Sequence, residues 1–202
     1  FDEFFGFLWG KHSYLDWSSD ATNPILRGFE PVVDSTYLTE AITREAVSFI
    51  DRHRDAPFFL CVAYNEVHEP METPAAQYLD RFPAATDPQR KTFLAMLAAM
   101  DDGVGEVLDK LLATGILENT LVIFLSDNGG PTSVNTSSNL PLRGEKTELW
   151  EGGIRVPFLL QWNGRVPAGG VYENPVIQLD IFSTALAAAR VGPNDDEVID
   201  RV

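Results

Sequence analysis

A short apolar, β-branched run that stops abruptly at polar residues constrains the fold of this chain most strongly. Leu121 to Leu125 has the pattern of a buried strand, and Ser126, Asp127, Asn128 and two glycines follow it at once. In open α/β sheets, ligands bind at the edge where such strands end. The Asp127 carboxylate and the Asn128 amide carbonyl are hard oxygen donors of the kind that Ca²⁺ or Mg²⁺ prefers, and Lys146 supplies a compact positive charge. The sequence therefore predicts a metal-assisted site for an anionic ester.

Helical and strand-like periods alternate along the rest of the chain. Three helices are expected, from Asp34 or Ser35 to about Arg52, from about Pro88 to a cap at Gly115, and from Asp180 to Ala189 with a stop near Gly192 and Pro193. Continuous apolar runs at 58–63 and 156–161 predict strands, the first of them covered on both faces. Because helices separate the strands, the sequence predicts an α/β fold with a mostly parallel sheet and helices on both faces.

In that arrangement the loops that bear His68 and Asp127 leave the same edge of the sheet and share one site. The polar loop at 131–142 is expected to form a wall of this site. Plainer explanations stay open for each residue. Asn-Gly after Asp127 also favours a hairpin turn, although no alternating strand follows it. A single histidine such as His68 is often a hydrogen-bonded structural residue, and Lys146 has the acidic neighbours of an ordinary surface lysine.

Composition narrows the classes of partner. The chain has 202 residues, of which 45% are hydrophobic, which suffices for one large domain or most of one. Its formal net charge of −15 opposes binding to nucleic acid or to anionic membrane surfaces. A bound cation together with Lys146 and Arg143 would reverse the field locally, because charges are screened beyond roughly 10 Å. The sequence carries no signal of oligomeric state.

Five segments occur in a characteristic order. They are FDEFFGF at Gly6, PFFLCVAYNEVHEP around His68, AMDDGVGEVLDKL from Ala99, LSDNGG at Asp127, and LRGEKTELWEGGIRVP around Lys146. Their order and spacing resemble the type I sulfatases, of the arylsulfatase and N-acetylgalactosamine-6-sulfatase type, in the alkaline-phosphatase-like superfamily. The resemblance spans nearly the whole chain. It implies that Asp127 and Asn128 are Ca²⁺ ligands, with Mg²⁺ as the alternative, and that His68 and Lys146 are catalytic residues that hold the sulfate and the bridging ester oxygen.

The family also uses residues that this sequence does not contain. Its nucleophile is a formylglycine made from the cysteine of a C-x-P-S-R or C-x-A-x-R motif, and it carries an Asp-Asp pair near the mature N-terminus. Neither is found here. The only cysteine, Cys61, starts a segment with Asn65 where the motif requires Arg, and we expect it to be a small buried apolar residue. Residues 1–202 are therefore expected to be a partial sulfatase catalytic domain, lacking an N-terminal segment and a C-terminal subdomain and inactive as it stands.

The reaction implied by the resemblance is hydrolysis of a sulfate ester on a small molecule or a glycan. A hydrated formylglycine from the missing segment would attack sulfur, Lys146 would stabilise the oxygen charge, and His68 would bind the sulfate or protonate the leaving oxygen. The family also implies an extracytoplasmic location. Two alternatives remain. One is a phosphatase or phosphodiesterase of the same superfamily, although the three histidines of the chain, His12, His53 and His68, are few for a site that binds two zinc ions. The other is a non-catalytic remnant.

Overall fold

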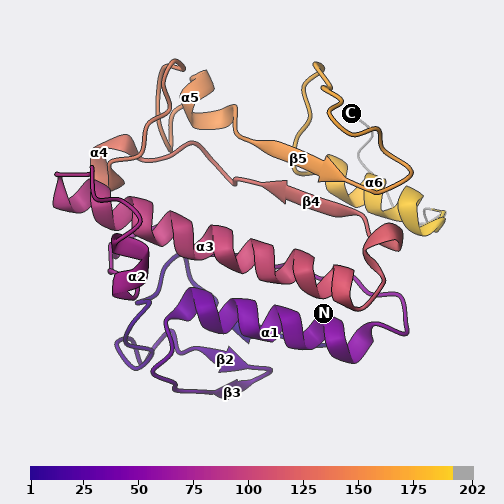
Figure 1. Cartoon of the computed structure of the whole chain (residues 1–202), viewed down its shortest axis with the longest axis horizontal. Helices are drawn as coiled ribbons and strands as arrows, with labels where there is room; N and C mark the ends of the chain where they lie inside the picture. Colours follow the sequence, from indigo (N-terminus) through magenta and orange to yellow (C-terminus); the bar gives the residue numbers. More distant parts are fainter. Residues whose placement is uncertain (193–202) are drawn as a thin grey trace.

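The computed structural model describes residues 1–192. In chain order its elements are β1 (Phe5–Gly6), β2 (Leu26–Arg27), β3 (Glu30–Pro31), α1 (Leu38–His53), α2 (Ala76–Leu79), α3 (Pro88–Ala113), η1 (Leu117–Asn119), β4 (Val122–Leu125), α4 (Thr132–Asn135), α5 (Glu151–Ile154), β5 (Phe158–Gln161) and α6 (Asp180–Ala189). Figure 1 shows them as layers, with β2 and β3, then α1, then α3, then the β4–β5 ribbon. Within residues 1–192, no helix combines the length and the hydropathy of a membrane-spanning segment.

The strand pairing is antiparallel. β1, β2 and β3 form one small sheet in that order, and β4 pairs with β5 in a separate ribbon, with Val122 opposite Gln161 and Leu125 opposite Phe158. The expected parallel pairing is therefore wrong for residues 1–192. The connection from β4 to β5 starts and ends at the same end of the ribbon and contains only two four-residue helices, so it does not form the helical crossover that parallel strands need.

The apolar run at 58–63 does not form a strand. Its residues alternate between half-buried and exposed positions, as in an extended chain, but no strand is assigned to it. Phe58 packs on Phe49 of α1 and Val62 packs against the core, whereas Phe59 points outward. Cys61 is exposed, so the prediction that it is buried is wrong. A strand needs a hydrogen-bonded neighbour, and an apolar pattern alone cannot supply one.

The long helix α3 confirms the predicted bounds. The Asp87 carboxylate accepts a hydrogen bond from the Arg90 backbone N–H at 2.6 Å, and Pro88 occupies the first turn, where its missing N–H costs nothing. Beyond the helix, Gly115 has a φ of +75°, the left-handed conformation that glycine adopts without strain. The strands expected near 121–125 and 156–161 and the helix Asp180–Ala189 are confirmed as β4, β5 and α6. The expected stop at Pro193 lies outside the described residues.

Helix α1 begins later than the sequence indicates. The Asp34 side chain accepts hydrogen bonds from Ser35 and Thr36, which closes a local turn ahead of the helix. Tyr37 stacks on Tyr14 with ring centroids 5.4 Å apart, so a tertiary contact sets the start of α1 at Leu38. The predicted start at Asp34 or Ser35 is therefore corrected.

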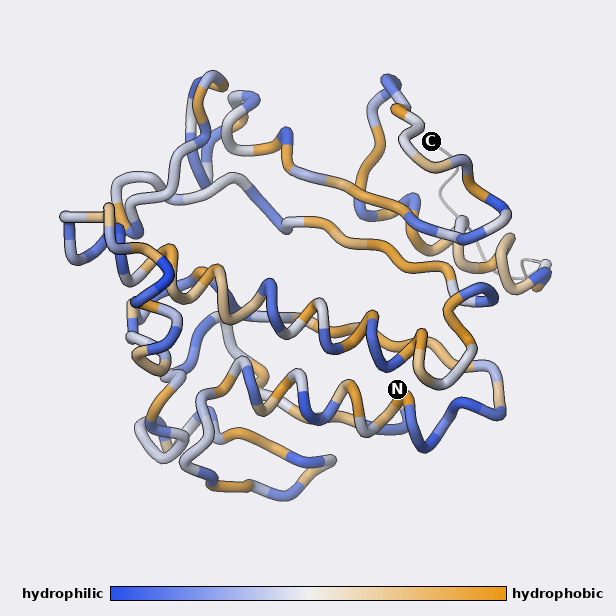
Figure 2. The backbone as a smooth tube through the Cα atoms, in the orientation of Figure 1, coloured by the Kyte–Doolittle hydropathy of each residue, from blue (hydrophilic) through white to orange (hydrophobic). Residues whose placement is uncertain are grey.

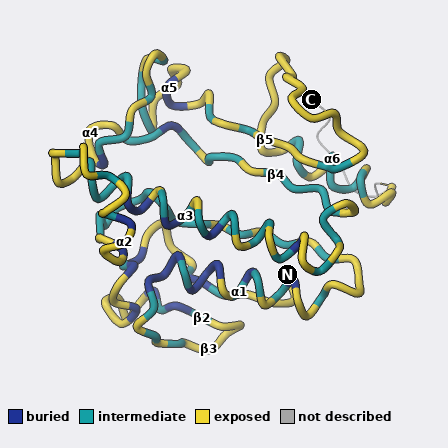
Figure 3. The backbone as a smooth tube through the Cα atoms, in the orientation of Figure 1, coloured by how far each residue is buried: buried dark blue, intermediate teal, exposed yellow. Residues whose placement is uncertain are grey.

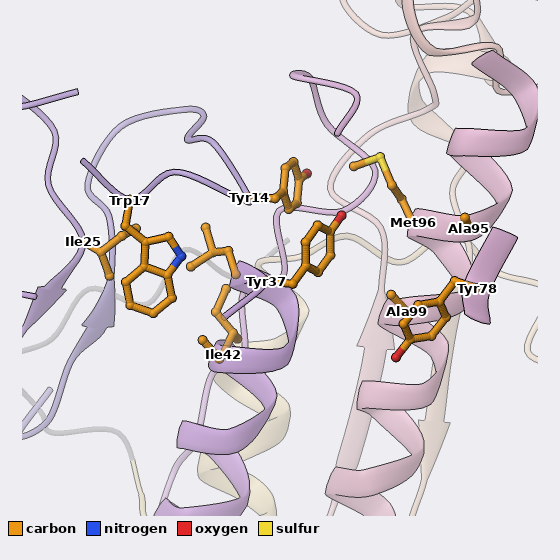
Figure 4. Packing of buried hydrophobic residues seen from close by; sticks show 11 residues of the cluster. Tyr14, Trp17, Ile25, Tyr37, Ile42, Tyr78, Ala95, Met96 and Ala99 are labelled. Carbon is orange, nitrogen blue, oxygen red and sulfur yellow. The ribbon is translucent and has the colours of Figure 1, made fainter. Parts of the chain in front are cut away.

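The core lies between α1, α3 and the N-terminal segment. Figure 4 shows Tyr14, Tyr37 and Met96 among the residues that fill it, and Figure 3 shows that burial is concentrated along α1. The two helices approach closely at Gly103, where an added Cβ would collide with the Thr43 hydroxyl. The β4–β5 ribbon is different: it is apolar in Figure 2 yet half-buried or exposed in Figure 3. The fold thus joins one well-packed half to one open half.

Candidate active site

A cavity of about 1810 Å³ lies between the N-terminal segment, the 58–63 run, α3 and the loops that follow β4. All four predicted site residues, His68, Asp127, Asn128 and Lys146, line it. The structure therefore brings to one cavity the residues that the sequence analysis selected from three separate segments.

His68 lies in a loop that is fixed from both sides. Its backbone N–H donates to the Asn65 carbonyl at 2.9 Å, and the buried Tyr14 hydroxyl lies 2.6 Å from the Asn65 carbonyl oxygen and 3.0 Å from that of His68. The ring Nδ1 is 3.0 Å from the Glu69 carbonyl oxygen, which can only accept, so Nδ1 carries a proton in this contact. The lone pair of a neutral His68 is thereby placed on Nε2.

Lys146 meets that lone pair. Its Nζ lies 3.1 Å from His68 Nε2, although the two residues are 78 positions apart in the chain. Its neighbour Glu145 accepts hydrogen bonds from the Thr132 hydroxyl and from the backbone and hydroxyl of Ser133, which hold the pKa of Glu145 below its usual value. Glu145 is thus engaged with the α4 segment, and Lys146 is half-buried rather than a freely solvated lysine.

Asp127 and Asn128 follow β4 directly. Asp127 Oδ1 accepts from the Asn128 backbone N–H at 2.9 Å, and Asn128 Nδ2 donates to the Gly129 carbonyl at 3.0 Å. The loop is clamped to the α5 segment by a hydrogen bond of 2.8 Å from Gly129 N–H to the Gly153 carbonyl. At Gly129 an added Cβ would meet the Gly152 carbonyl, so only glycine fits this close approach. The turn is not part of a tight hairpin, because β5 returns only at Phe158.

These two residues match a hard cation in chemistry but supply an incomplete ligand set. A carboxylate and an amide carbonyl suit Ca²⁺ or Mg²⁺, whereas Ca²⁺ takes six to eight oxygen ligands. Within residues 1–192 no group of three or more His, Cys, Asp or Glu side chains is placed to hold a metal. Asp127 and Asn128 can therefore contribute two ligands of such a site, and the others must come from further groups.

Two asparagines that were not predicted as site residues connect the loops of the site. Asn139 donates through Nδ2 to the carbonyls of Gly130 and Gly144 and accepts from the Gly130 N–H, so it joins the Asp127 loop to the Lys146 loop. Asn135, which is buried, donates to the Val67 carbonyl at 2.8 Å beside His68. Both lie in the loop expected to wall the site, which also contains the unpredicted short helix α4. The sequence does carry one signal for these contacts: the polar loop is rich in asparagine, and asparagine side-chain amides readily form hydrogen bonds with backbone groups.

Charge around the cavity is uneven. Arg155 lines the cavity and forms an ion pair with Glu151 at 3.4 Å. Arg143, expected to add positive charge near Lys146, instead lies over the Trp150 ring, 4.0 Å from its centroid. Glu66 also lines the cavity, but its carboxyl oxygens are enclosed and have no hydrogen-bond partner among the described residues. Burial raises the pKa of Glu66 to about 8, which favours the neutral form of this carboxyl.

The other two histidines have separate contacts. His12 is buried and bonds through Nδ1 to the Ser13 carbonyl, and its ring packs against Phe7. His53, at the end of α1, bonds through Nε2 to Glu3 at 2.6 Å. Nothing in this arrangement favours the dizinc phosphatase alternative.

Comparison with known proteins places these residues in context. The sequence matches the protein-family profile described as sulfatase over residues 1–191. It is 31% identical to the uncharacterized sulfatase YdeN of Escherichia coli K12, a match covering 100% of this chain and 35% of that protein. It is 37% identical to the N-acetylgalactosamine-6-sulfatase of Canis lupus familiaris, covering 81% of this chain and 31% of the relative. The chain thus spans about a third of the length of these curated relatives.

Solved structures agree with the sequence comparison. Ps i-CgsB, crystallised in complex with k-i-k-neocarrahexaose, has a TM-score of 0.92 and 34% identity, covering 99% of this chain and 48% of that one. The PsFucS1 sulfatase from Pseudoalteromonas sp. has a TM-score of 0.67 and 35% identity, covering 76% of this chain and 30% of that one. The predicted α/β fold of the alkaline-phosphatase-like type is confirmed, although the strands within residues 1–192 pair antiparallel.

Proposed function

Because the chain belongs to the sulfatase family, we propose that it forms part of a sulfatase catalytic domain and binds the sulfate ester of a sulfated glycan. The observation that carries the proposal is the contact of 3.1 Å between Lys146 Nζ and His68 Nε2 in a cavity that Asp127 and Asn128 also line. The neocarrahexaose bound to Ps i-CgsB favours a glycan over a smaller sulfated molecule. We also propose an extracytoplasmic location, which the family resemblance implies.

The contacts define what each side chain would do. Lys146 donates to His68 in the free protein and keeps two more N–H protons for a sulfate oxygen or the bridging ester oxygen. The Glu69 carbonyl fixes His68 so that Nε2 faces Lys146, where it would bind a sulfate oxygen or, when protonated, donate that proton to the leaving oxygen. In a cavity partly closed to water, such preplaced donors stabilise developing charge more than exposed ones would.

Besides Lys146 and His68, the proposal includes a bound cation and a nucleophile. Asp127 and Asn128 would hold a Ca²⁺ ion, or Mg²⁺ as the alternative, which when bound supplies positive charge for the sulfate oxygens. The sequence of 202 residues contains no motif for formylglycine, so we propose that a segment outside residues 1–202 supplies the nucleophile. The chain by itself would then bind the sulfate ester without cleaving it.

Calorimetric titration of the chain with inorganic sulfate in the presence of CaCl₂ tests the proposal. We expect Lys146→Ala and His68→Ala each to weaken sulfate binding by roughly tenfold or more, since charged hydrogen bonds are worth about 1.5–3 kcal/mol. Lys110→Ala is the matched control, because Lys110 pairs with Asp51 on the helices and does not line the cavity. Equal sulfate affinity in all four proteins would remove the assignment.

A second experiment distinguishes sulfatase from phosphatase chemistry. In a protein extended to include a formylglycine segment, we expect hydrolysis of an aryl sulfate, lost on chelation of calcium and in Lys146→Ala. Preferential hydrolysis of an aryl phosphate with bound zinc would instead favour the phosphatase alternative.

A further inference from the structure

A large, exposed aromatic side chain lines the cavity that contains the proposed site. Trp9 is 66% exposed and lines the same cavity as His68 and Lys146. Leaving an indole in water forgoes a burial free energy of about 1.5–3 kcal/mol or more, so such a residue is usually covered or used. Trp9 is of interest here because it is both exposed and part of the cavity wall.

The turn that carries Trp9 is rigid. The backbone N–H groups of Leu8 and Trp9 both donate to Asn23 Oδ1 at 3.3 Å, and Asn23 Nδ2 donates to the Lys11 carbonyl at 3.1 Å. Asn23 itself is only 3% exposed. A ring contact of 5.5 Å between Phe7 and His12 brings the two ends of the turn together. Trp9 is therefore presented by a preorganised turn rather than exposed through disorder of the segment.

The same turn is fastened to the His68 loop. Lys11 Nζ forms an ion pair of 2.7 Å with Glu69, the residue after His68, and this contact lowers the pKa of the Glu69 carboxyl. Three residues further on, the Tyr14 hydroxyl contacts the His68 carbonyl oxygen at 3.0 Å. The segment from Lys11 to Tyr14 thus runs beside the His68 loop, with Trp9 just ahead of it.

From this geometry we propose that Trp9 is a specificity-determining residue that stacks on the sugar ring next to the sulfate ester. The inference rests on the proposed function and deepens it, because it names the part of the substrate recognised beyond the sulfate. A pyranose ring presents an apolar face of C–H groups and a polar rim of hydroxyls, which matches a flat indole held by a fixed backbone. Inorganic sulfate lacks such a ring and would not contact Trp9.

The test compares two probes on the same set of proteins by calorimetric titration in CaCl₂. The probes are a neocarrahexaose and inorganic sulfate, and the variants are Trp9→Ala, Trp9→Phe, Leu8→Ala and Lys146→Ala. Leu8→Ala is the matched control, because Leu8 is 72% exposed in the same turn but does not line the cavity. Circular dichroism melts establish that each variant is folded as the wild type is.

We expect Trp9→Ala to weaken hexasaccharide binding by roughly five- to tenfold and to leave sulfate binding unchanged, as loss of an aromatic contact predicts. Trp9→Phe should retain affinity within about threefold because it keeps a flat apolar face. Leu8→Ala should match the wild type with both probes, and Lys146→Ala should weaken both.

Two results would overturn the inference and they are distinguishable. If Trp9→Ala binds the hexasaccharide as the wild type does while Lys146→Ala weakens both probes, Trp9 has no role in selection and the proposed function stands. If the wild-type chain binds neither probe, the proposed function fails and the inference about Trp9 fails with it.

Discussion

The α1–α3 half of the molecule and the β4–β5 half are stabilised by different interactions. Between α1 and α3, apolar side chains such as Leu38 and Met96 are fully buried, and the helices touch at a glycine. Around β4 and β5, by contrast, Leu159 is 61% exposed, and the loops are held by asparagine side chains and backbone hydrogen bonds. Packing thus supplies the stability in one half, while polar contacts fix the geometry of the proposed site in the other.

The largest effect should come from a cavity made in the packed half. Met96 is fully buried, so Met96→Ala should lower the free energy of unfolding by about 2–5 kcal/mol. The counterpart in the ribbon, Leu159→Ala, should change it by less than about 0.5 kcal/mol. Urea denaturation measures both values. Equal losses for the two variants would show that the halves are not stabilised differently.

The buried carboxyl of Glu66, which lines the cavity, should make the free energy of unfolding depend on pH. Burial raises the pKa of Glu66 to about 8 in the folded state, against 4.5 for a free glutamate. Between these values the folded protein keeps a proton that the unfolded chain has lost, so stability is greatest below pH 4.5 with respect to this group. It should fall by up to about 1.4 kcal/mol for each pH unit as the pH rises toward 8.

Chemical denaturation from pH 5 to 8 measures this slope. Glu66→Gln removes the titrating group and should flatten the dependence, whereas Glu30→Gln, at an exposed position, should leave the slope as in the wild type. A Glu66→Gln protein with the wild-type slope would contradict the burial of this carboxyl.

Two glycines of α3, two residues apart, sharpen the comparison within the packed half. Gly103→Ala places a methyl group against the Thr43 side chain and 3.0 Å from the Tyr64 hydroxyl. This crowding should lower the free energy of unfolding by about 1–3 kcal/mol. Gly105 has no atom within 4 Å of the new Cβ, so Gly105→Ala should gain up to about 1 kcal/mol of helix propensity. Thermal melts of both variants measure the opposite signs. Destabilisation by both would mean that helix packing at Gly103 is not the cause.

The same division explains what the sequence could predict. The bounds of α3 follow from local signals, since Pro88 and Gly115 act on their immediate neighbours. The apolar pattern at 58–63 predicts a strand that the structure does not contain, because the pattern is local whereas a strand needs a hydrogen-bonded partner from elsewhere. The two-residue strands β1 to β3 have too few residues for any periodicity to show. The pairing of strands depends on distant segments, so the sequence locates β4 and β5 but does not predict that they pair antiparallel.

For the site as well, local sequence patterns indicate single residues but not which of them meet in the fold. Asp127 and Asn128 were selected from their place after an apolar run, a local pattern. Lys146 is indicated by its charge and His68 by its place after an apolar run, but their roles follow only from the family resemblance, and nothing within either segment indicates a partner 78 residues away. Their meeting depends on loops joined by side chains such as Asn139, whose partners only the folded structure reveals. Their catalytic roles remain predictions.

Asn139 tests whether polar contacts position the site while adding little to stability. Asn139→Ala removes three hydrogen bonds to Gly130 and Gly144. Because these bonds lie in partly buried loops, the free energy of unfolding should fall by only about 1 kcal/mol. Sulfate affinity should nevertheless fall severalfold, because the Lys146 loop loses its link to the Asp127 loop. Asn139→Asp keeps the acceptor for the Gly130 N–H and loses both donated bonds, so it should resemble the alanine variant. If instead affinity is unchanged in both, the backbone contact between Gly129 and Gly153 suffices to hold the loops, and asparagine is not the positioning element.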